Sequence, residues 1–163
     1  MRKFWIVLFA VVCGLGLSSC NWNQTETKSS KIFPNDIWNR FELLEGKFTI
    51  SNVKKQYDIK VELCVLNGFE QSRIPIEVAI TSPSGQVNIL NQILITKDNQ
   101  DNYVGKVHGN VWTIEQTIYA NKEFTEEGEY SFSVQNRTQY YELFKVKSVS
   151  FSVSVSKKQR KNE

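Results

Sequence analysis

Serine alternates with apolar residues from Ser148 to Ser156, and no other feature restricts the fold of this chain as strongly. The apolar members of this stretch are Val149, Phe151, Val153 and Val155. Successive side chains of a β-strand point to opposite faces, so the stretch predicts a strand with one buried and one solvated face. A register shift of one residue would bury five hydroxyl groups, and we therefore expect the register to be firmly set.

Similar alternation recurs through the rest of the chain. It is clearest between Tyr57 and Val65, where apolar residues occupy every second position and Asp58, Lys60 and Glu62 lie between them. The same reasoning predicts further strands at residues 40–50, 74–80, 87–95, 103–107, 111–120 and 130–135. The turn signals between these stretches are Asn67-Gly68, Ser82-Pro83-Ser84-Gly85 and Gly109-Asn110.

These strands predict an all-β fold, because no part of the chain beyond residue 19 shows a convincing helical period. Seven or eight short strands joined by turns favour an antiparallel β-sandwich, and a partly open β-barrel is the alternative. Pro75 has no backbone N–H, so we expect it at a strand start or on a sheet edge, where a partner could add a strand. The aromatic bend at residues 136–145 holds at most one helical turn.

The first 19 residues have the pattern of a signal peptide. Arg2 and Lys3 precede an uncharged, mostly apolar run of 14 residues from Phe4 to Leu17. A membrane-spanning helix needs roughly 20 such residues, so this run is too short to span a bilayer and instead indicates export.

The end of this run, Leu17-Ser18-Ser19-Cys20, resembles the bacterial lipobox. The resemblance implies cleavage between Ser19 and Cys20 and attachment of lipid, including fatty acids such as palmitate, to the Cys20 thiol. Two or three acyl chains would hold the protein at a bilayer. An ordinary secretory signal that happens to precede a cysteine is the alternative interpretation.

The chain therefore divides into four predicted parts. Residues 1–19 are the signal peptide, 20–34 the lipidated cysteine and a flexible polar tether, 35–156 the sandwich domain, and 157–163 a basic disordered tail. Cys13 leaves with the signal and Cys20 carries lipid, so Cys64 alone remains and no internal disulfide is possible. We expect Cys64 to be a small buried hydrophobe, with a reactive thiol as the alternative.

Composition excludes several classes of function. Without its signal the chain has 18 cations and 17 acids, which gives no basic face for nucleic acid. His108 is the single histidine, so neither a metal site nor a catalytic triad is expected. The acids Glu126, Glu127 and Glu129 are interpreted as solvated charge around a turn. We therefore expect no catalytic residues and no cofactor, with a carboxylate-pair hydrolase as a remote alternative.

Aromatic residues are the better candidates for binding. Trp112, Tyr140 and Tyr141 are predicted either to anchor a protein partner or to form a stacking platform for sugars. The first hypothesis gives a binding or assembly module, and the second gives a glycan-binding protein of the cell envelope.

The order of these features resembles the gliding-motility lipoprotein H (GldH) family of Bacteroidota. The motifs that carry the resemblance are Phe33-Pro34-Asn35 with Trp38, the strand at 57–63, Ile76-Glu77-Val78-Ala79-Ile80 before Ser82-Pro83-Ser84-Gly85, residues 127–135, and Leu143-Phe144-Lys145-Val146. The resemblance implies a non-catalytic lipoprotein anchored in the outer membrane. It also implies partners in the gliding machinery and the accompanying type IX secretion apparatus. By resemblance to lipoprotein sorting rules, Asn21 after the modified cysteine is compatible with transfer to the outer membrane. The tether has no acidic run of the kind that marks surface-exposed lipoproteins, which favours the periplasmic face.

Overall fold

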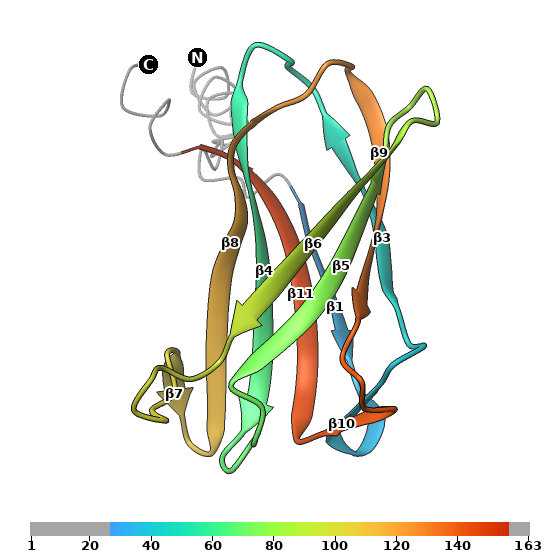
Figure 1. Ribbon diagram of the computed structural model, residues 1–163. Coiled ribbons are helices and arrows are strands. Elements are labelled where there is room, and N and C mark those ends of the chain that lie inside the picture. The colour runs from blue at the N-terminus through green and yellow to red at the C-terminus, as the bar shows by residue number, and fades with distance from the viewer. Residues whose placement is uncertain (1–26, 157–163) are drawn as a thin grey trace, which may run out of the picture.

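Eleven antiparallel strands form two packed sheets and a short ribbon in the computed structural model, which describes residues 27–156 (Figure 1). The larger sheet has the order β1 (Thr27–Ile32), β11 (Val146–Val155), β4 (Gln56–Leu66), β8 (Val111–Glu123) and β7 (Lys106–His108). The smaller sheet has the order β3 (Leu44–Ile50), β9 (Gly128–Asn136), β5 (Arg73–Thr81) and β6 (Val87–Ile95). The ribbon pairs β2 (Ile37–Asn39) with β10 (Glu142–Phe144), after the 3₁₀ turn η2 (Pro34–Asp36).

The predicted antiparallel β-sandwich is confirmed, and no closed barrel is present among the described residues. Eleven strands exceed the expected seven or eight, because β1, β2 and β10 were not predicted. The strand expected to begin at residue 40 begins at Leu44. Within the described part of the chain, no helix is long and apolar enough to cross a bilayer.

The core lies between the two sheets and follows the predicted alternation. Every second residue of β4 is fully buried, and in β11 Phe151 lies opposite Val61 of β4. The Phe151 ring stacks on Phe132 of the smaller sheet with ring centroids 3.9 Å apart. Ser150 and Ser156 were expected in solvent and are instead buried. Their hydroxyl groups are satisfied there, since Ser150 bonds the hydroxyl of Ser30 in β1 and Ser156 donates to Asp58.

The predicted tether is wrong for Thr27–Ile32, which form strand β1. These six residues pair with β11 in register from Thr27 opposite Val153 to Ile32 opposite Ser148. An edge strand is held by backbone hydrogen bonds along one side, so a polar sequence can form it without an apolar stripe. The sandwich domain therefore includes Thr27–Ile32, which precede the predicted boundary at residue 35. The predictions for the signal peptide, Cys20 and the basic tail lie outside the described residues.

Three other local predictions meet different outcomes in the structure. The expected strand at 103–107 is replaced by a single bridge between Tyr103 and Lys97, followed by β7. The aromatic bend, for which at most one helical turn was expected, contains the short strand β10, which pairs with β2. Pro75 lies near a strand start as expected, one residue before the pairing of β5 with β9 begins at Ile76. However, β5 lies between β9 and β6, so it offers no free edge.

Gly105 is placed where the chain turns into β7, and this position has no room for a side chain. A Cβ there would clash with the backbone oxygen of Thr113 and lie 2.8 Å from Cγ1 of Ile114. We expect Gly105→Ala to lower the free energy of unfolding by about 1–3 kcal/mol, because the contacted backbone belongs to a paired strand. Denaturant unfolding of both proteins measures the difference.

Gly109 provides the matched control for this substitution. It has a φ of +61° and a Cβ there would meet no atom within 4 Å. Asparagine tolerates positive φ, so Gly109→Asn should change stability by less than about 0.5 kcal/mol. Equal losses for the two variants would show that the close approach at Gly105 is not what limits that position.

Candidate interaction surface

One end of the sandwich gathers exposed aromatic residues from segments far apart in sequence. The loop after β2, the loop joining β4 to β5 and the segment containing β10 meet there, because β10 pairs with β2 directly before β11 begins. Thr27 pairs with Val153 at the other end of β11 (Figure 1). The length of β11 therefore separates this end from Thr27 by on the order of 30 Å.

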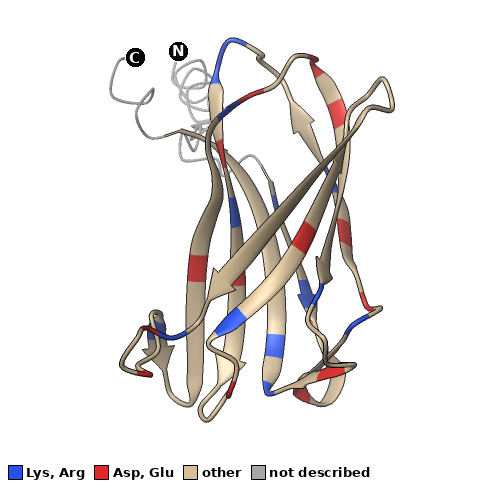
Figure 2. Cartoon of the chain, viewed as in Figure 1, with Lys and Arg blue, Asp and Glu red and all other residues tan. Residues whose placement is uncertain are grey.

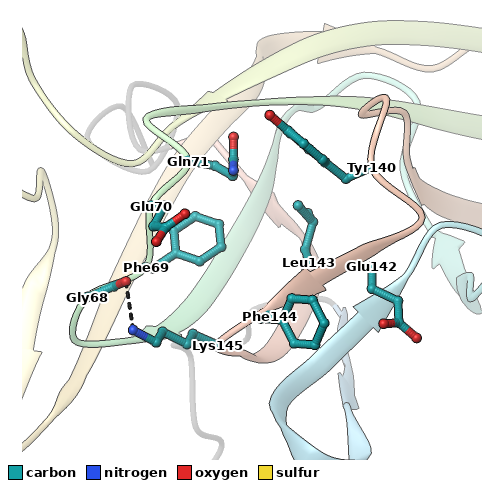
Figure 3. A pocket seen from close by; sticks show the side chains of 9 residues that line it. All are labelled: Gly68, Phe69, Glu70, Gln71, Tyr140, Glu142, Leu143, Phe144 and Lys145. Carbon is teal, nitrogen blue, oxygen red and sulfur yellow. Dashed lines mark hydrogen bonds between the residues drawn. The ribbon is translucent and has the colours of Figure 1, made fainter.

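A hollow of about 260 Å³ lies at this end, between the β4–β5 loop and the β10 segment (Figure 3). Its apolar base includes Phe69 and Leu143, which are both 2% exposed. Tyr140 and Phe144 line it from opposite sides and remain 45% and 60% exposed. The hollow therefore combines a buried apolar floor with exposed aromatic walls.

Charged residues surround the hollow. The amine of Lys145 donates a hydrogen bond of 2.9 Å to the carbonyl oxygen of Gly68, which ties the two sides of the hollow together. The backbone oxygen of Lys145 also accepts a 2.9 Å bond from the N–H of Leu66. Glu70 and Glu142 line the hollow as well, and neither forms an ion pair within residues 27–156. An occupant with a cationic group would therefore find two available carboxylates.

Beside the hollow, Phe41 and Tyr141 form an exposed aromatic pair. Their rings meet edge to face, with centroids 5.7 Å apart and planes at 72°. They are 68% and 60% exposed, and the N–H of Arg40 bonds the carbonyl oxygen of Tyr141 at 2.8 Å, which holds the two loops together. We call Phe41, Tyr140, Tyr141 and Phe144 the distal aromatic patch. Clustered exposed aromatics of this kind are typical of protein interaction sites.

The structure brings together two of the three predicted binding residues. Tyr140 and Tyr141 lie in the distal aromatic patch, whereas Trp112 lies at the start of β8, on the other side of β4 and β11 (Figure 1). Trp112 is half-buried, and its ring is stacked on Tyr103 with centroids 4.7 Å apart. One face of its indole is therefore already covered and is not available to a sugar.

The structure also places the other residues that the sequence singled out. His108 is exposed at the end of β7. Cys64 lies on the outward face of β4, half-buried, with its sulfur 3.7 Å from the Thr113 hydroxyl, so the expectation of a core position is wrong. Glu126 accepts hydrogen bonds from the N–H and hydroxyl of Ser84. Among the described residues, no group of three or more His, Cys, Asp or Glu side chains is arranged to hold a metal ion.

Sequence reasoning missed Phe41 and Phe144. Phe144 was visible as part of the aromatic bend, but only its pairing in β10 shows that its side chain faces solvent while Leu143 is buried. Phe41 precedes Tyr141 by 100 residues, and no local signal links the two.

The chain matches one family of known proteins. The model of a family described as GldH lipoprotein matches residues 25–153, which include all or most of every strand. No curated protein matches the chain.

Proposed function

The chain belongs to the GldH lipoprotein family, which is associated with gliding motility, and on that premise we propose that it is a non-catalytic binding or assembly component of the cell envelope. Acyl chains on Cys20 hold it at the periplasmic face of the outer membrane. Its distal aromatic patch binds a protein of the gliding machinery or of the type IX secretion apparatus. The family membership supports the lipoprotein character.

The position of the distal aromatic patch is the observation that supports this proposal. Cys20 precedes Thr27 by seven residues, which span at most about 25 Å when fully extended. The patch lies at the end of the sandwich away from Thr27. A protein anchored through Cys20 can therefore present this end away from its attachment point, where soluble or membrane partners reach it.

The chemistry of the patch suits a protein ligand. Tyrosine and other aromatic residues carry a large share of binding energy in protein interfaces because they bury much area with few rotatable bonds. The hollow beside them has an apolar floor, with Glu70 and Glu142 on its lining. An apolar side chain next to a lysine or arginine of the partner fits this combination.

Polar substitution of the patch tests the proposal. We expect Phe41→Ser/Tyr141→Ser to reduce the recovery of gliding or secretion components after crosslinking in cells by at least about tenfold, because two hot-spot side chains are lost. The full-length protein is purified after crosslinking, and the proteins that are recovered with it are quantified by mass spectrometry. Val104→Ser/Val107→Ser is the control, since these valines are 48% and 55% exposed and lie outside the patch.

The outcome separates the proposal from its rivals. Recovery of abundant porins alone, with no machinery component, would contradict it. Equal recovery from the patch variant and the control variant would show that another surface binds the partner.

Glycan binding is the second candidate function, and the two exposed tyrosines favour it. It now rests on Tyr140 and Tyr141, since Trp112 is stacked on Tyr103. A glycan array on which the wild-type protein binds and Tyr141→Ala does not would support this function. Absence of any sugar signal removes it.

A further inference from the structure

Strand β6 is an edge of the smaller sheet and lacks the features that usually protect an edge strand. Among the strands of residues 27–156, it pairs with β5 alone. Natural edge strands are commonly blocked by charged residues, proline or bulges. Residues 87–95 contain no charged residue and no proline, and Figure 2 draws β6 without an acidic or basic position along its length. Its pairing with β5 runs without a register shift.

The outward face of this edge is apolar. Its exposed side chains come from alternate positions and are Val87 at 57%, Ile89 at 55%, Ile93 at 49% and Ile95 at 39% exposed. Asn91 continues this row and is exposed as well. Four branched aliphatic side chains in solvent on one strand are unusual for a protein surface and mark an interaction site.

The side chain of Gln116 shows which backbone groups of β6 point away from β5. Its amide nitrogen donates to the oxygen of Ile93 at 2.9 Å, and its amide oxygen accepts from the N–H of Ile95 at 3.1 Å. The amide of Gln116 thus satisfies the edge as the backbone of a neighbouring strand would. Backbone groups two residues apart in a strand point the same way, so those of Val87, Ile89 and Asn91 also face outward.

Along residues 87–91 this edge is open. Among the described residues, no hydrogen bond occupies the outward backbone groups of Val87, Ile89 and Asn91. At Ile93 and Ile95 the edge is closed by the side chain of Gln116, which belongs to β8. Figure 1 shows that β6 and β8 come together near the end of β6 and diverge toward its start. Leu90, on the inward face of β6, is packed against the core but only partly buried. A strand added beside residues 87–91 would place its own side chains next to Leu90 on the inward face and next to Val87 and Ile89 on the outward face.

We infer that β6 binds an extended segment of a partner protein, which adds to the smaller sheet as a further strand beside residues 87–91. The segment is uncharged and carries branched aliphatic residues where it meets Val87, Ile89 and Leu90, because no charge on β6 would pair with a charged side chain. Beside Asn88 and Asn91 it meets uncharged amide side chains. This inference rests on the proposed binding function and names a second contact, separate from the distal aromatic patch.

Amide hydrogen exchange gives a signature that only strand addition produces. In the purified full-length protein, we expect the N–H groups of Ile89 and Asn91 to exchange fast, and those of Asn88, Leu90 and Gln92, which face β5, to exchange slowly. In the crosslinked complex isolated from membranes, Ile89 and Asn91 should become protected by at least about tenfold. Docking of a partner on the aliphatic face alone would leave these two amides exchanging fast, and that result would overturn the inference.

Substitutions on the free side of β6 test the same inference in cells. Asn91→Pro removes one outward N–H, and Ile89→Lys adds a charge to the aliphatic row. With a crosslinking group placed at residue 87, we expect each substitution to lower the yield of crosslinked partner about tenfold. Val107→Lys is the control, because Val107 is also 55% exposed and lies on another edge strand. Thermal unfolding of each variant verifies that it is folded. Unchanged crosslinking in folded Asn91→Pro and Ile89→Lys proteins would overturn the inference.

Two further outcomes are informative. Protection of Ile89 and Asn91 in the purified protein alone would show that a second copy of this chain pairs with β6, which also overturns the inference. Loss of partner recovery in Phe41→Ser/Tyr141→Ser, with no effect of Asn91→Pro, would leave the proposed function standing without the added strand.

Discussion

Phe151→Ala is expected to lower the free energy of unfolding by about 3–5 kcal/mol, the cost of deleting a large aromatic side chain from a packed core. Phe151 is fully buried in β11. Its ring stacks on Phe132 and lies 6.0 Å from Phe48, centroid to centroid, so it joins the larger sheet to two strands of the smaller one. Guanidinium unfolding followed by tryptophan fluorescence measures the change, because Trp38 is fully buried in the same core.

Phe144→Ala is the matched control, since it deletes the same atoms from a side chain that is 60% exposed. We expect it to change stability by less than about 0.5 kcal/mol. A small loss of stability for Phe151→Ala would contradict a tightly packed contact between the two sheets at this residue. A large loss for Phe144→Ala would mean that the distal aromatic patch is a structural element and not a free binding surface.

The sandwich could be predicted because its central strands each bury one face. Strands β4 and β11 alternate fully buried and more exposed residues over most of their lengths, and this burial is what the period-two sequence pattern records. Phe151 and its neighbours fix the register in the same way, since a slip would exchange the two faces. The family resemblance proposed from motif order is likewise confirmed by the match over residues 25–153.

The strands that the sequence did not predict either have no fully buried face or are too short to show a periodic pattern. Strand β1 has no fully buried residue and is held by its ladder with β11. Strands β2 and β10 have three residues each, too few for a periodic pattern to be recognised. Strand order is also a long-range property. Pro75 predicted a strand start or an edge, and it lies near the start of β5, which is an interior strand. The neighbouring edge strand is β6, whose apolar residues are less regularly spaced than those of β5.

The candidate site was predictable only in part for the same reason. Tyr140 and Tyr141 are conspicuous in sequence, and both are exposed. Phe41 joins them only because β2 pairs with β10, and Trp112 leaves the set because Tyr103 stacks on it. Local patterns identify aromatic residues but do not show which of them share a surface.

Cys20→Ala is expected to abolish cleavage between Ser19 and Cys20, remove all fatty-acid mass from the amino terminus and empty the outer-membrane fraction of this protein. The thiol is the group that would carry the lipid, and alanine offers no nucleophile in its place. A single chain of about 14 carbons binds a bilayer only reversibly, with an association constant of about 10⁴ M⁻¹, and stable anchoring needs more than one chain, so loss of every acyl chain should release the protein from the outer membrane. Membrane fractionation and mass spectrometry of the amino-terminal peptide measure both effects.

Cys64→Ala separates loss of the anchor from loss of a thiol. Cys64 lies on the outward face of β4 near Thr113, so its replacement should leave processing, lipid mass and fractionation as in the wild-type protein. Cys13→Ala extends the control to a cysteine within the predicted signal, where alanine preserves the apolar run. A Cys20→Ala protein that is still cut after residue 19 and withstands carbonate washing of the outer membrane would contradict anchoring through Cys20. The distal aromatic patch and the β6 edge would then have to act from a protein attached to the envelope in some other way.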